Sequence, residues 1–361
     1  MSGDPARSAL DARLLGWMGE PWQRDDARFE ATAREVFVYQ FEHCKPYERF
    51  CRGRGVTPAS LRSWEEIPAV PTGAFKELTL SSFPAGAGRH VFRTSGTSGE
   101  ARGELHLDTL KLYEASLLAS LERFVLSGLP RAARICVLAP APKELPDSSL
   151  SHMFGVAVAA RGDGVSGFFV RSGALQLEPL LAALHEGEVP VALCGTAFSF
   201  VHLLDELGAS DRRLRLPTGS RVMETGGFKG RAREIPQDEL YASLEARLGV
   251  PRDRIINQYG MTELGSQFYD TTIHDPDAPR RKLGPPWARV RIIEPESGEP
   301  CAPGAIGALV VHDLANTGSI AAIQTADIGR NVADGFEVLG REPGAEARGC
   351  SIALDDLLGS G

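Results

Sequence analysis

The sequence has no apolar run long enough for a membrane span. Its longest ones, such as Val189 to Cys194 and Phe154 to Ala160, fall far short of the roughly 20 residues that a helix needs to cross a bilayer. The N-terminal stretch Met1 to Arg13 mixes Asp with Arg and lacks the apolar centre of a secretory signal. These absences predict a cytoplasmic protein without a membrane span.

Cysteine pairs and excess basic charge are also missing. The six cysteines are scattered and form no Cys-x-x-Cys pair, which argues against a disulfide framework and against a structural zinc site. The formal net charge is −8 over 361 residues. An acidic chain gains nothing from counterion release on a phosphate backbone, so the sequence disfavours a nucleic-acid partner.

The central part of the chain alternates apolar strands with helices. Segments 134–139, 189–194, 221–224 and 254–257 are predicted strands, and segments 107–126, 178–185, 195–207 and 238–248 are predicted helices. This alternation is typical of a mostly parallel sheet that is covered by helices on both faces. The first 70 residues are predicted to be helical, since Phe29, Val36, Phe37 and Phe41 recur near helical spacing.

The sequence pattern changes after Pro285-Pro286. Segments 290–293, 306–312 and 335–339 are short predicted strands joined by Gly/Pro turns, which indicates a small antiparallel β-subdomain. We therefore expect four regions: a helical N-terminal region at 1–89, an α/β core at 90–284, the β-subdomain at 285–341, and a tail at 342–361.

A hydroxyl-rich loop follows the predicted strand 90–93. It packs four hydroxyls and two glycines into six residues: Thr94, Ser95, Gly96, Thr97, Ser98 and Gly99. Such a loop can bend around an anion and offer N–H and O–H donors to phosphate oxygens. No Gly-Lys-Ser/Thr follows at the spacing of a Walker A motif. An ordinary polar turn remains the alternative.

Three further motifs follow along the chain. In Tyr259-Gly260-Met-Thr262-Glu263, a carboxylate beside a hydroxyl near a strand end suits Mg²⁺ and phosphate, and Tyr259 offers a ring for base stacking. In Thr325-Ala-Asp327, the carboxylate can accept hydrogen bonds from ribose hydroxyls. The last is Gly340-Arg341. The alternatives are a helix cap at Thr262, a turn at Asp327 and a surface arginine at 341.

Taken in this order, the four motifs resemble those of the acyl-adenylate-forming enzymes. Within that superfamily the chain is most similar to the acyl-protein synthetases of bacterial bioluminescence, on Glu224-Thr-Gly-Gly-Phe-Lys-Gly230 and on Arg348-Gly-Cys-Ser351. The resemblance implies the large N-terminal α/β domain of these enzymes. Because the sequence stops soon after Arg341, it also implies that the usual C-terminal domain with its lysine is absent.

The resemblance also implies a reaction. By this likeness, a carboxylic acid of the fatty type is joined to AMP from Mg²⁺-bound ATP, passed to the thiol of Cys350, and handed to a partner such as an acyl reductase. In this scheme the residues from Thr94 to Gly99 hold phosphates, Thr262 contacts the α-phosphate, Glu263 holds the metal, Asp327 holds the ribose, and Arg341 precedes the hinge.

Departures from the family pattern keep alternatives open. The phosphate loop continues to Arg102 where a lysine is usual, and Lys229 is the candidate substitute for the missing catalytic lysine. His152 matches the acyl-pocket position only weakly. An acyl-CoA ligase that uses free coenzyme A, or a nucleotide-binding protein without turnover, would carry the same motifs.

Overall fold

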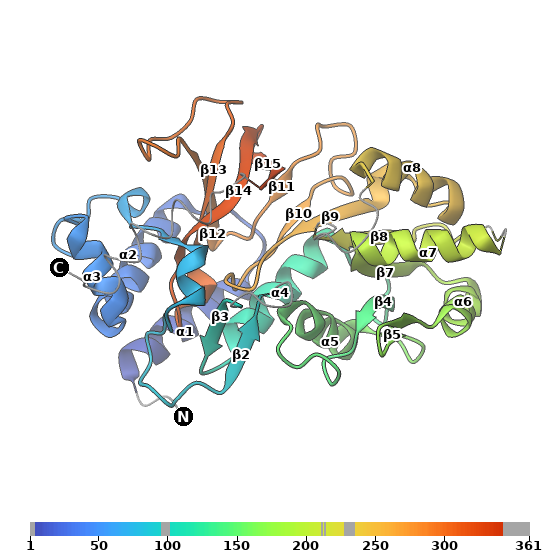
Figure 1. Ribbon diagram of the computed structural model, residues 1–361, viewed down its shortest axis with the longest axis horizontal. Coiled ribbons are helices and arrows are strands. Elements are labelled where there is room, and N and C mark those ends of the chain that lie inside the picture. The colour runs from blue at the N-terminus through green and yellow to red at the C-terminus, as the bar shows by residue number, and fades with distance from the viewer. Residues whose placement is uncertain (1–3, 95–101, 211, 213, 227–234, 342–361) are drawn as a thin grey trace. The chain divides into compact units, whose positions relative to one another are not determined.

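The computed structural model describes residues 4–94, 102–210, 212, 214–226 and 235–341. The chain forms two compact units (Figure 1). Unit 1 contains Met1–Ala119, Met261–Gln267 and Leu283–Gly361, and unit 2 contains Ser120–Gly260 and Phe268–Lys282. The chain passes between them within helix α4 (Lys111–Phe124), between Gly260 and Met261, after Gln267, and within the short strand β11 (Lys282–Leu283).

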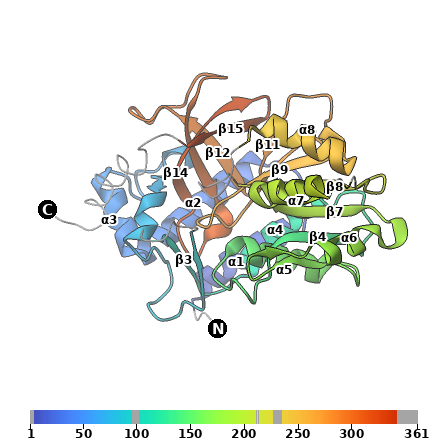
Figure 2. The same ribbon diagram turned by 45° about the vertical axis from the view of Figure 1, so that its right-hand side comes forward.

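Unit 2 is built on a parallel sheet with the strand order β9-β8-β7-β4-β5. These strands are β4 (Arg134–Pro140), β5 (Gly167–Arg171), β7 (Val191–Thr196), β8 (Arg221–Thr225) and β9 (Ile255–Tyr259). Short antiparallel strands, β10 (Phe268–Asp270) and β6 (Ala174–Leu175), pair with β9 and β5. Thr196 pairs with Thr225, and Thr225 pairs with Gln258, so the carboxyl ends of β7, β8 and β9 lie side by side (Figure 2).

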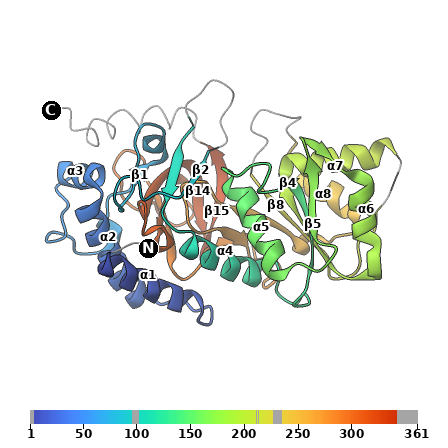
Figure 3. The same ribbon diagram turned by 90° about the horizontal axis from the view of Figure 1, so that it is seen from below.

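Helices cover both faces of this sheet. Figure 3 shows α5 (Ser149–Arg161) on one face and α6 (Leu177–His185), α7 (Ala197–Ala209) and α8 (Gln237–Leu248) on the other. The core beneath α6, α7 and α8 includes Leu193, Phe200 and Leu244, which are fully buried. Because both faces are covered, β7 and β8 are buried along nearly their whole length. The predicted helix-covered parallel sheet is confirmed.

Unit 1 holds the antiparallel strands β12 (Ala288–Ile293), β13 (Gly307–Asp313), β14 (Ala322–Val332) and β15 (Gly335–Arg341), paired in that order. The two-residue strand β1 (Val70–Pro71) pairs with β14 in parallel. A separate hairpin consists of β2 (His90–Arg93) and β3 (Glu104–Leu107). The small antiparallel subdomain is confirmed, although the sequence did not predict β14 as a strand.

The N-terminal helices of unit 1 are α1 (Pro5–Met18), α2 (Asp26–His43) and α3 (Lys45–Gly53). Asp4 caps α1 by accepting a hydrogen bond from the N–H of Ala6, and Pro5 takes the first helical position, where its missing N–H costs nothing. Short 3₁₀ turns complete the described chain: η1 (Trp64–Glu66), η2 (Thr72–Lys76), η3 (Glu186–Glu188), η4 (Arg252–Arg254) and η5 (Leu314–Asn316). The α-helices therefore extend only to Gly53, whereas the sequence predicted helix over the first 70 residues.

Two boundary predictions were wrong. The helix expected at 107–126 begins at Lys111, because Leu107 pairs with His90 as the last residue of β3. The strand expected at 254–257 runs on to Tyr259, so Asn257 and Tyr259 lie within β9 rather than after it. In the described part of the chain, no helix is both long and apolar enough to span a bilayer.

Candidate active site

The hydroxyl-rich loop closes the β2–β3 hairpin of unit 1. The backbone N–H of Thr94 donates to the carbonyl of Gly103 (2.9 Å), and the N–H of Gly103 donates to Oγ1 of Thr94 (2.9 Å). Nε of Arg102 donates to the Thr94 carbonyl (2.6 Å). Thr94 and Gly103 therefore extend the hairpin by one pair. The other predicted loop residues, Ser95, Gly96, Thr97, Ser98 and Gly99, lie outside the described residues.

Thr262 and Glu263 lie at the loop end of this hairpin. Oγ1 of Thr262 is 3.5 Å from the carbonyl oxygen of Arg93, the residue before Thr94. A Cβ placed on Gly103 would be 3.2 Å from Cγ2 of Thr94 and 3.6 Å from Oε1 of Glu263. The start of the hydroxyl-rich loop and the Thr-Glu pair are thus adjacent within unit 1, although more than 150 residues separate them in the sequence.

The residues at this point fit a magnesium ion that arrives with phosphate. Mg²⁺ keeps several waters and takes one or two carboxylates together with phosphate oxygens. The carboxylate of Glu263 is one such ligand, next to the hydroxyl of Thr262. Among the described residues, no group of three or more His, Cys, Asp or Glu side chains forms a complete metal cage. A Mg²⁺ ion bound together with a nucleotide would take Glu263 as its protein carboxylate here.

Asp327 and Arg341 form a second group in unit 1. They face each other across β14 and β15, with Nε of Arg341 3.7 Å from Oδ1 of Asp327. The Asp327 side chain is only 14% exposed, whereas that of Arg341 is 68% exposed. Oγ1 of Thr325 accepts a hydrogen bond from the N–H of Asp327 (3.1 Å) and donates to the carbonyl of Leu309 (3.0 Å). Asp327 thus lies within a hydrogen-bonded strand, not in a turn.

A buried polar network joins the strand ends of unit 2. The carboxylate of Glu224, on β8, accepts hydrogen bonds from the hydroxyl of Tyr241 (2.8 Å) and the amide of Asn257 on β9 (2.5 Å). Burial raises the pKa of Glu224. Asp270 accepts from the backbone N–H of Asn257 (2.9 Å) and from Nζ of Lys282 (2.9 Å). The network fixes β8 against β9 just before the motif residues that follow both strands.

Three further predicted residues, Tyr259, Gly260 and His152, lie in unit 2. Tyr259 is half-buried at the end of β9, and its ring packs against Phe268 with centroids 6.2 Å apart. Gly260 follows as the last residue before the chain enters unit 1. His152 lies half-buried on α5. Lys229 lies outside the described residues, as does Cys350.

Sequence reasoning missed a buried network behind Glu263. The side-chain amide of Asn316 donates to the carbonyl of Glu263 (2.6 Å). Asp313, which is fully buried, accepts hydrogen bonds from the backbone N–H and the hydroxyl of Ser266 (2.7 Å each). Burial raises the pKa of Asp313 to about 6. The available signal was an Asp directly after the apolar run 306–312, a common capping position.

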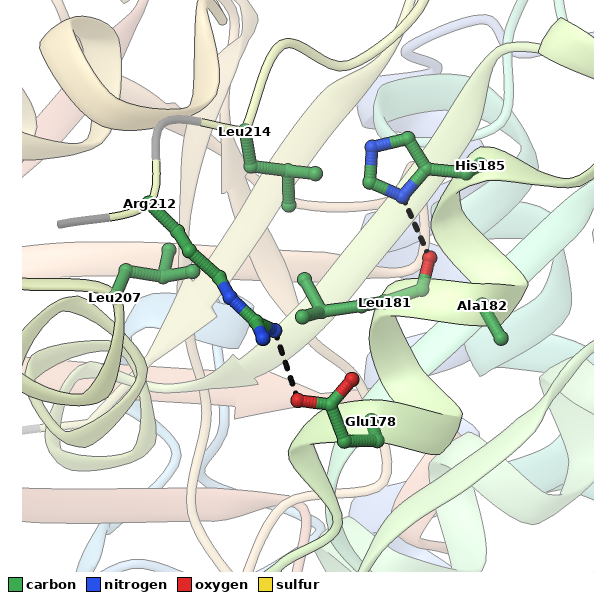
Figure 4. Close-up of a pocket in the computed structure, with 7 residues that line it drawn as sticks. All are labelled: Glu178, Leu181, Ala182, His185, Leu207, Arg212 and Leu214. Atoms are coloured by element: carbon green, nitrogen blue, oxygen red, sulfur yellow. Dashed lines mark hydrogen bonds and ion pairs between the residues drawn. The ribbon is translucent and has the colours of Figure 1, made fainter. Parts of the chain in front are cut away.

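Unit 2 also has a shallow groove of about 450 Å³, away from the strand ends that lead into the motifs. Figure 4 shows Glu178 and Arg212 joined by an ion pair at its side and the ring of His185 directed at the carbonyl of Leu181. Leu207 on α7 and Leu214 in the connection between α7 and β8 also line it. This connection leads into the amino end of β8, whereas Glu224 and Tyr259 lie at carboxyl ends.

Solved structures place this fold in a known class. A 2-hydroxyisobutyryl-CoA ligase, in an open conformation with 2-HIB-AMP and CoA, matches over 88% of this chain and 69% of its own with a TM-score of 0.66 and 16% identity. A luciferase-like enzyme from the nonluminescent mealworm Zophobas morio matches over 70% of this chain and 57% of its own (TM-score 0.51, 15% identity). The chain has the α/β fold of the adenylate-forming enzymes.

Sequence comparison identifies the family. The family model "Acyl-protein synthetase, LuxE" matches residues 7–359. A long-chain-fatty-acid–luciferin-component ligase of Aliivibrio fischeri is 23% identical over 336 residues, which cover 90% of this chain and 85% of that protein. The chain belongs to the LuxE acyl-protein synthetase family, and it is a ligase. The resemblance stated from the motifs is confirmed.

Proposed function

We propose that the protein activates a fatty acid with ATP and transfers the acyl group to its own Cys350. The observation that carries the adenylation step is the adjacency of Thr262 and Glu263 to the start of the hydroxyl-rich loop. It brings a carboxylate, a hydroxyl and Thr94, the first residue of the hydroxyl-rich loop, to one place. The family membership and the ligands named for the related 2-hydroxyisobutyryl-CoA ligase support the same chemistry.

The first step is attack of the acid carboxylate on the α-phosphorus of ATP. A new P–O bond forms, the bond from the α-phosphorus to the bridging oxygen breaks, and pyrophosphate leaves with acyl-AMP remaining. The protein's contribution is positioning and charge stabilisation. The loop from Thr94 to Gly99 would bind the β- and γ-phosphates, Thr262 the α-phosphate and Asp327 the ribose. Mg²⁺, held by Glu263, would neutralise phosphate charge.

The second step is attack of a thiolate on the acyl carbonyl of the mixed anhydride. The C–S bond forms, the C–O bond to AMP breaks, and the thiol proton passes to solvent. Four described cysteines suit this step poorly, because burial raises their pKa: Cys44 to about 11, Cys51 and Cys136 to about 12, and Cys194 further still. A thiol that stays protonated is a poor nucleophile. Cys301 is half-buried, and Cys350 carries the family likeness.

Acyl labelling tests this proposal. Incubation with ATP, Mg²⁺ and a long-chain fatty acid should raise the intact mass by one acyl group, and hydroxylamine should remove it. We expect Cys350→Ser to abolish the label while retaining acid-dependent pyrophosphate exchange, and Cys301→Ser to keep the label. Full labelling of Cys350→Ser would refute the assignment of the thiol. Rapid formation of acyl-CoA from added coenzyme A, without protein labelling, would support the coenzyme A ligase instead.

A further inference from the structure

The segment that carries Thr262 and Glu263 has no secondary structure of its own. Residues 261–267 form neither helix nor strand. They are a short stretch of unit 1 between two stretches of unit 2. A catalytic carboxylate has to stay within a fraction of an ångström of its productive position. Tertiary hydrogen bonds therefore have to hold this segment.

Asp313 supplies the first of these bonds. It is the last residue of β13 and is fully buried. Its Oδ2 accepts from the backbone N–H of Ser266, and its Oδ1 accepts from the Ser266 hydroxyl and from the N–H of Ala315 (3.1 Å). The donors are neutral groups, so the carboxylate is buried without an ion pair. Such burial costs stability, and a well-packed apolar residue would be the more stable choice.

Asn316 supplies the second. Its side-chain amide donates to the Glu263 carbonyl, while its own backbone carbonyl accepts from Nε2 of Gln40 on α2 (2.8 Å). Oε1 of Gln40 in turn accepts from the N–H of Ala321 (3.0 Å). The turn η5 is therefore fixed on its far side by a helix. Together, Asn316 and Asp313 hold the motif segment at two points, Glu263 and Ser266.

Gly265 lies between these two points. A Cβ built on it would be 3.0 Å from Cβ of Ala315 and 3.1 Å from Oδ1 of Asn316. Those distances are tighter than ordinary van der Waals contact, so the backbone of Gly265 lies directly against η5. The three contacts together leave the segment little freedom to slide along the turn.

We propose that Asp313 is a positioning residue for adenylation: through Ser266 it holds the segment that presents Thr262 and Glu263 to the nucleotide and its metal. The inference rests on the proposed function. Asp313→Asn is the decisive change, since it keeps the shape but replaces one carboxylate oxygen by an NH₂ group. That group is a donor facing the N–H and hydroxyl donors of Ser266, so at least one hydrogen bond is lost.

Acid-dependent ATP–pyrophosphate exchange measures the effect. We expect Asp313→Asn to lower kcat about tenfold or more and to raise the Mg²⁺ concentration needed for half-maximal rate. Its resistance to urea should fall modestly, because a buried amide donor then faces the N–H of Ser266 without an acceptor. Ser266→Ala keeps the hydrogen bond from the backbone N–H, so its kcat should lie between those of the parent protein and of Asp313→Asn. Glu263→Gln gives the reference for a lost metal ligand.

Asp163→Asn is the matched control. Oδ1 of Asp163 accepts from the N–H (2.9 Å) and hydroxyl (2.8 Å) of Ser166, so Asp163 also bonds both groups of one serine, although its Oδ2 pairs with Arg134 (3.0 Å). It lies in unit 2, which contains neither Thr262 nor Glu263. We expect this variant to retain the parental kcat and Mg²⁺ requirement. A loss of rate in Asp313→Asn that only matches the loss in Asp163→Asn would overturn the positioning role.

Hydrogen–deuterium exchange of the free protein tests the positioning role of Asp313 separately from the proposed adenylation activity. Faster exchange at the amides of residues 261–267 in Asp313→Asn, together with the altered Mg²⁺ requirement, supports the positioning role. Exchange and Mg²⁺ dependence like those of the parent protein would refute it. If the parent protein itself shows no pyrophosphate exchange with any acid, the proposed function fails, while the deuterium data still decide whether Asp313 holds the segment.

Discussion

The pKa values of two neighbouring residues of β13 are shifted in opposite directions because both residues are buried. His312 is fully buried, with its ring set edge-on against Trp64 at a centroid distance of 4.8 Å. Burial lowers the pKa of His312 from 6.5 to about 3, while it raises the pKa of Asp313 from 3.8 to about 6. Each group is held in its neutral form over the acidic range. The sequence alone shows neither shift, since burial is a property of the packed unit.

The His312 shift predicts acid sensitivity. Between pH 6.5 and 3 the unfolded chain binds a proton at His312 that the folded chain does not, so the contribution of His312 to stability falls as pH falls, by up to about 1.4 kcal/mol per pH unit, while Asp313 contributes with the opposite sign between about pH 6 and 3.8. Above pH 6.5 the contribution is fully present. We expect His312→Phe to flatten this slope in urea titrations between pH 6.5 and 4. His90→Phe, at an exposed site, should keep it, and equal slopes in all three proteins would contradict the prediction.

At the scale of elements, the sequence predicted strands where burial makes them apolar. β4 and β7 lie inside a sheet that is covered on both faces, and their continuous apolar runs revealed them. β14 was missed because its eleven residues mix Gln, Thr, Asp, Arg and Asn with few apolar side chains. It is held by pairing with both β13 and β15. The β14–β15 pair is a short hairpin, but the pairing of β14 with β1, Val70 to Ile323, is non-local, and no local pattern in the sequence encodes it.

Gly329 provides a test of this strand. It lies where the register between β14 and β15 shifts, and a Cβ there would be 2.2 Å from the carbonyl oxygen of Glu337 and 2.8 Å from Cδ1 of Leu309. We expect Gly329→Ala to destabilise the protein by about 2 kcal/mol in urea unfolding, since the packed strands must move apart. Gly167→Ala on β5, where no atom lies within 4 Å of the built Cβ, is the control. If both variants unfold at the parental urea concentration, Gly329 is not needed for close approach.

At the scale of the whole molecule, the predicted motifs are divided between two compact units. Thr94, Thr262, Glu263, Asp327 and Arg341 belong to unit 1, whereas Tyr259 and Gly260 belong to unit 2. The Tyr-Gly-Met-Thr-Glu motif therefore spans one of the points where the chain crosses between units. A division by linear sequence into consecutive regions does not describe this arrangement, because unit 1 is assembled from three separate stretches.

Lys229 belongs to this scale because it is the candidate phosphate-contacting lysine of the sequence motif that follows β8. It follows β8 and the buried Glu224, which the hydrogen bonds from Tyr241 and Asn257 fix in place. We expect Lys229→Ala to lower acid-dependent pyrophosphate exchange about 100-fold, as loss of one preorganised charge at a phosphate does. Lys45→Ala removes an exposed lysine of α3 that pairs with Glu48 and should leave the rate unchanged. An unaltered rate in Lys229→Ala would end this assignment.

The sequence by itself determined the family, the parallel and antiparallel halves of the fold, and the residue types of the predicted site, because these depend on short motifs and on local apolar periodicity. The tertiary structure decided what lies next to what. It brought Thr262 and Glu263 to the start of the hydroxyl-rich loop, and it placed Asp313 and Asn316 behind them. Those contacts join residues that are far apart in the chain. They depend on burial and on hydrogen bonds between segments, and the sequence of one segment predicts neither of these.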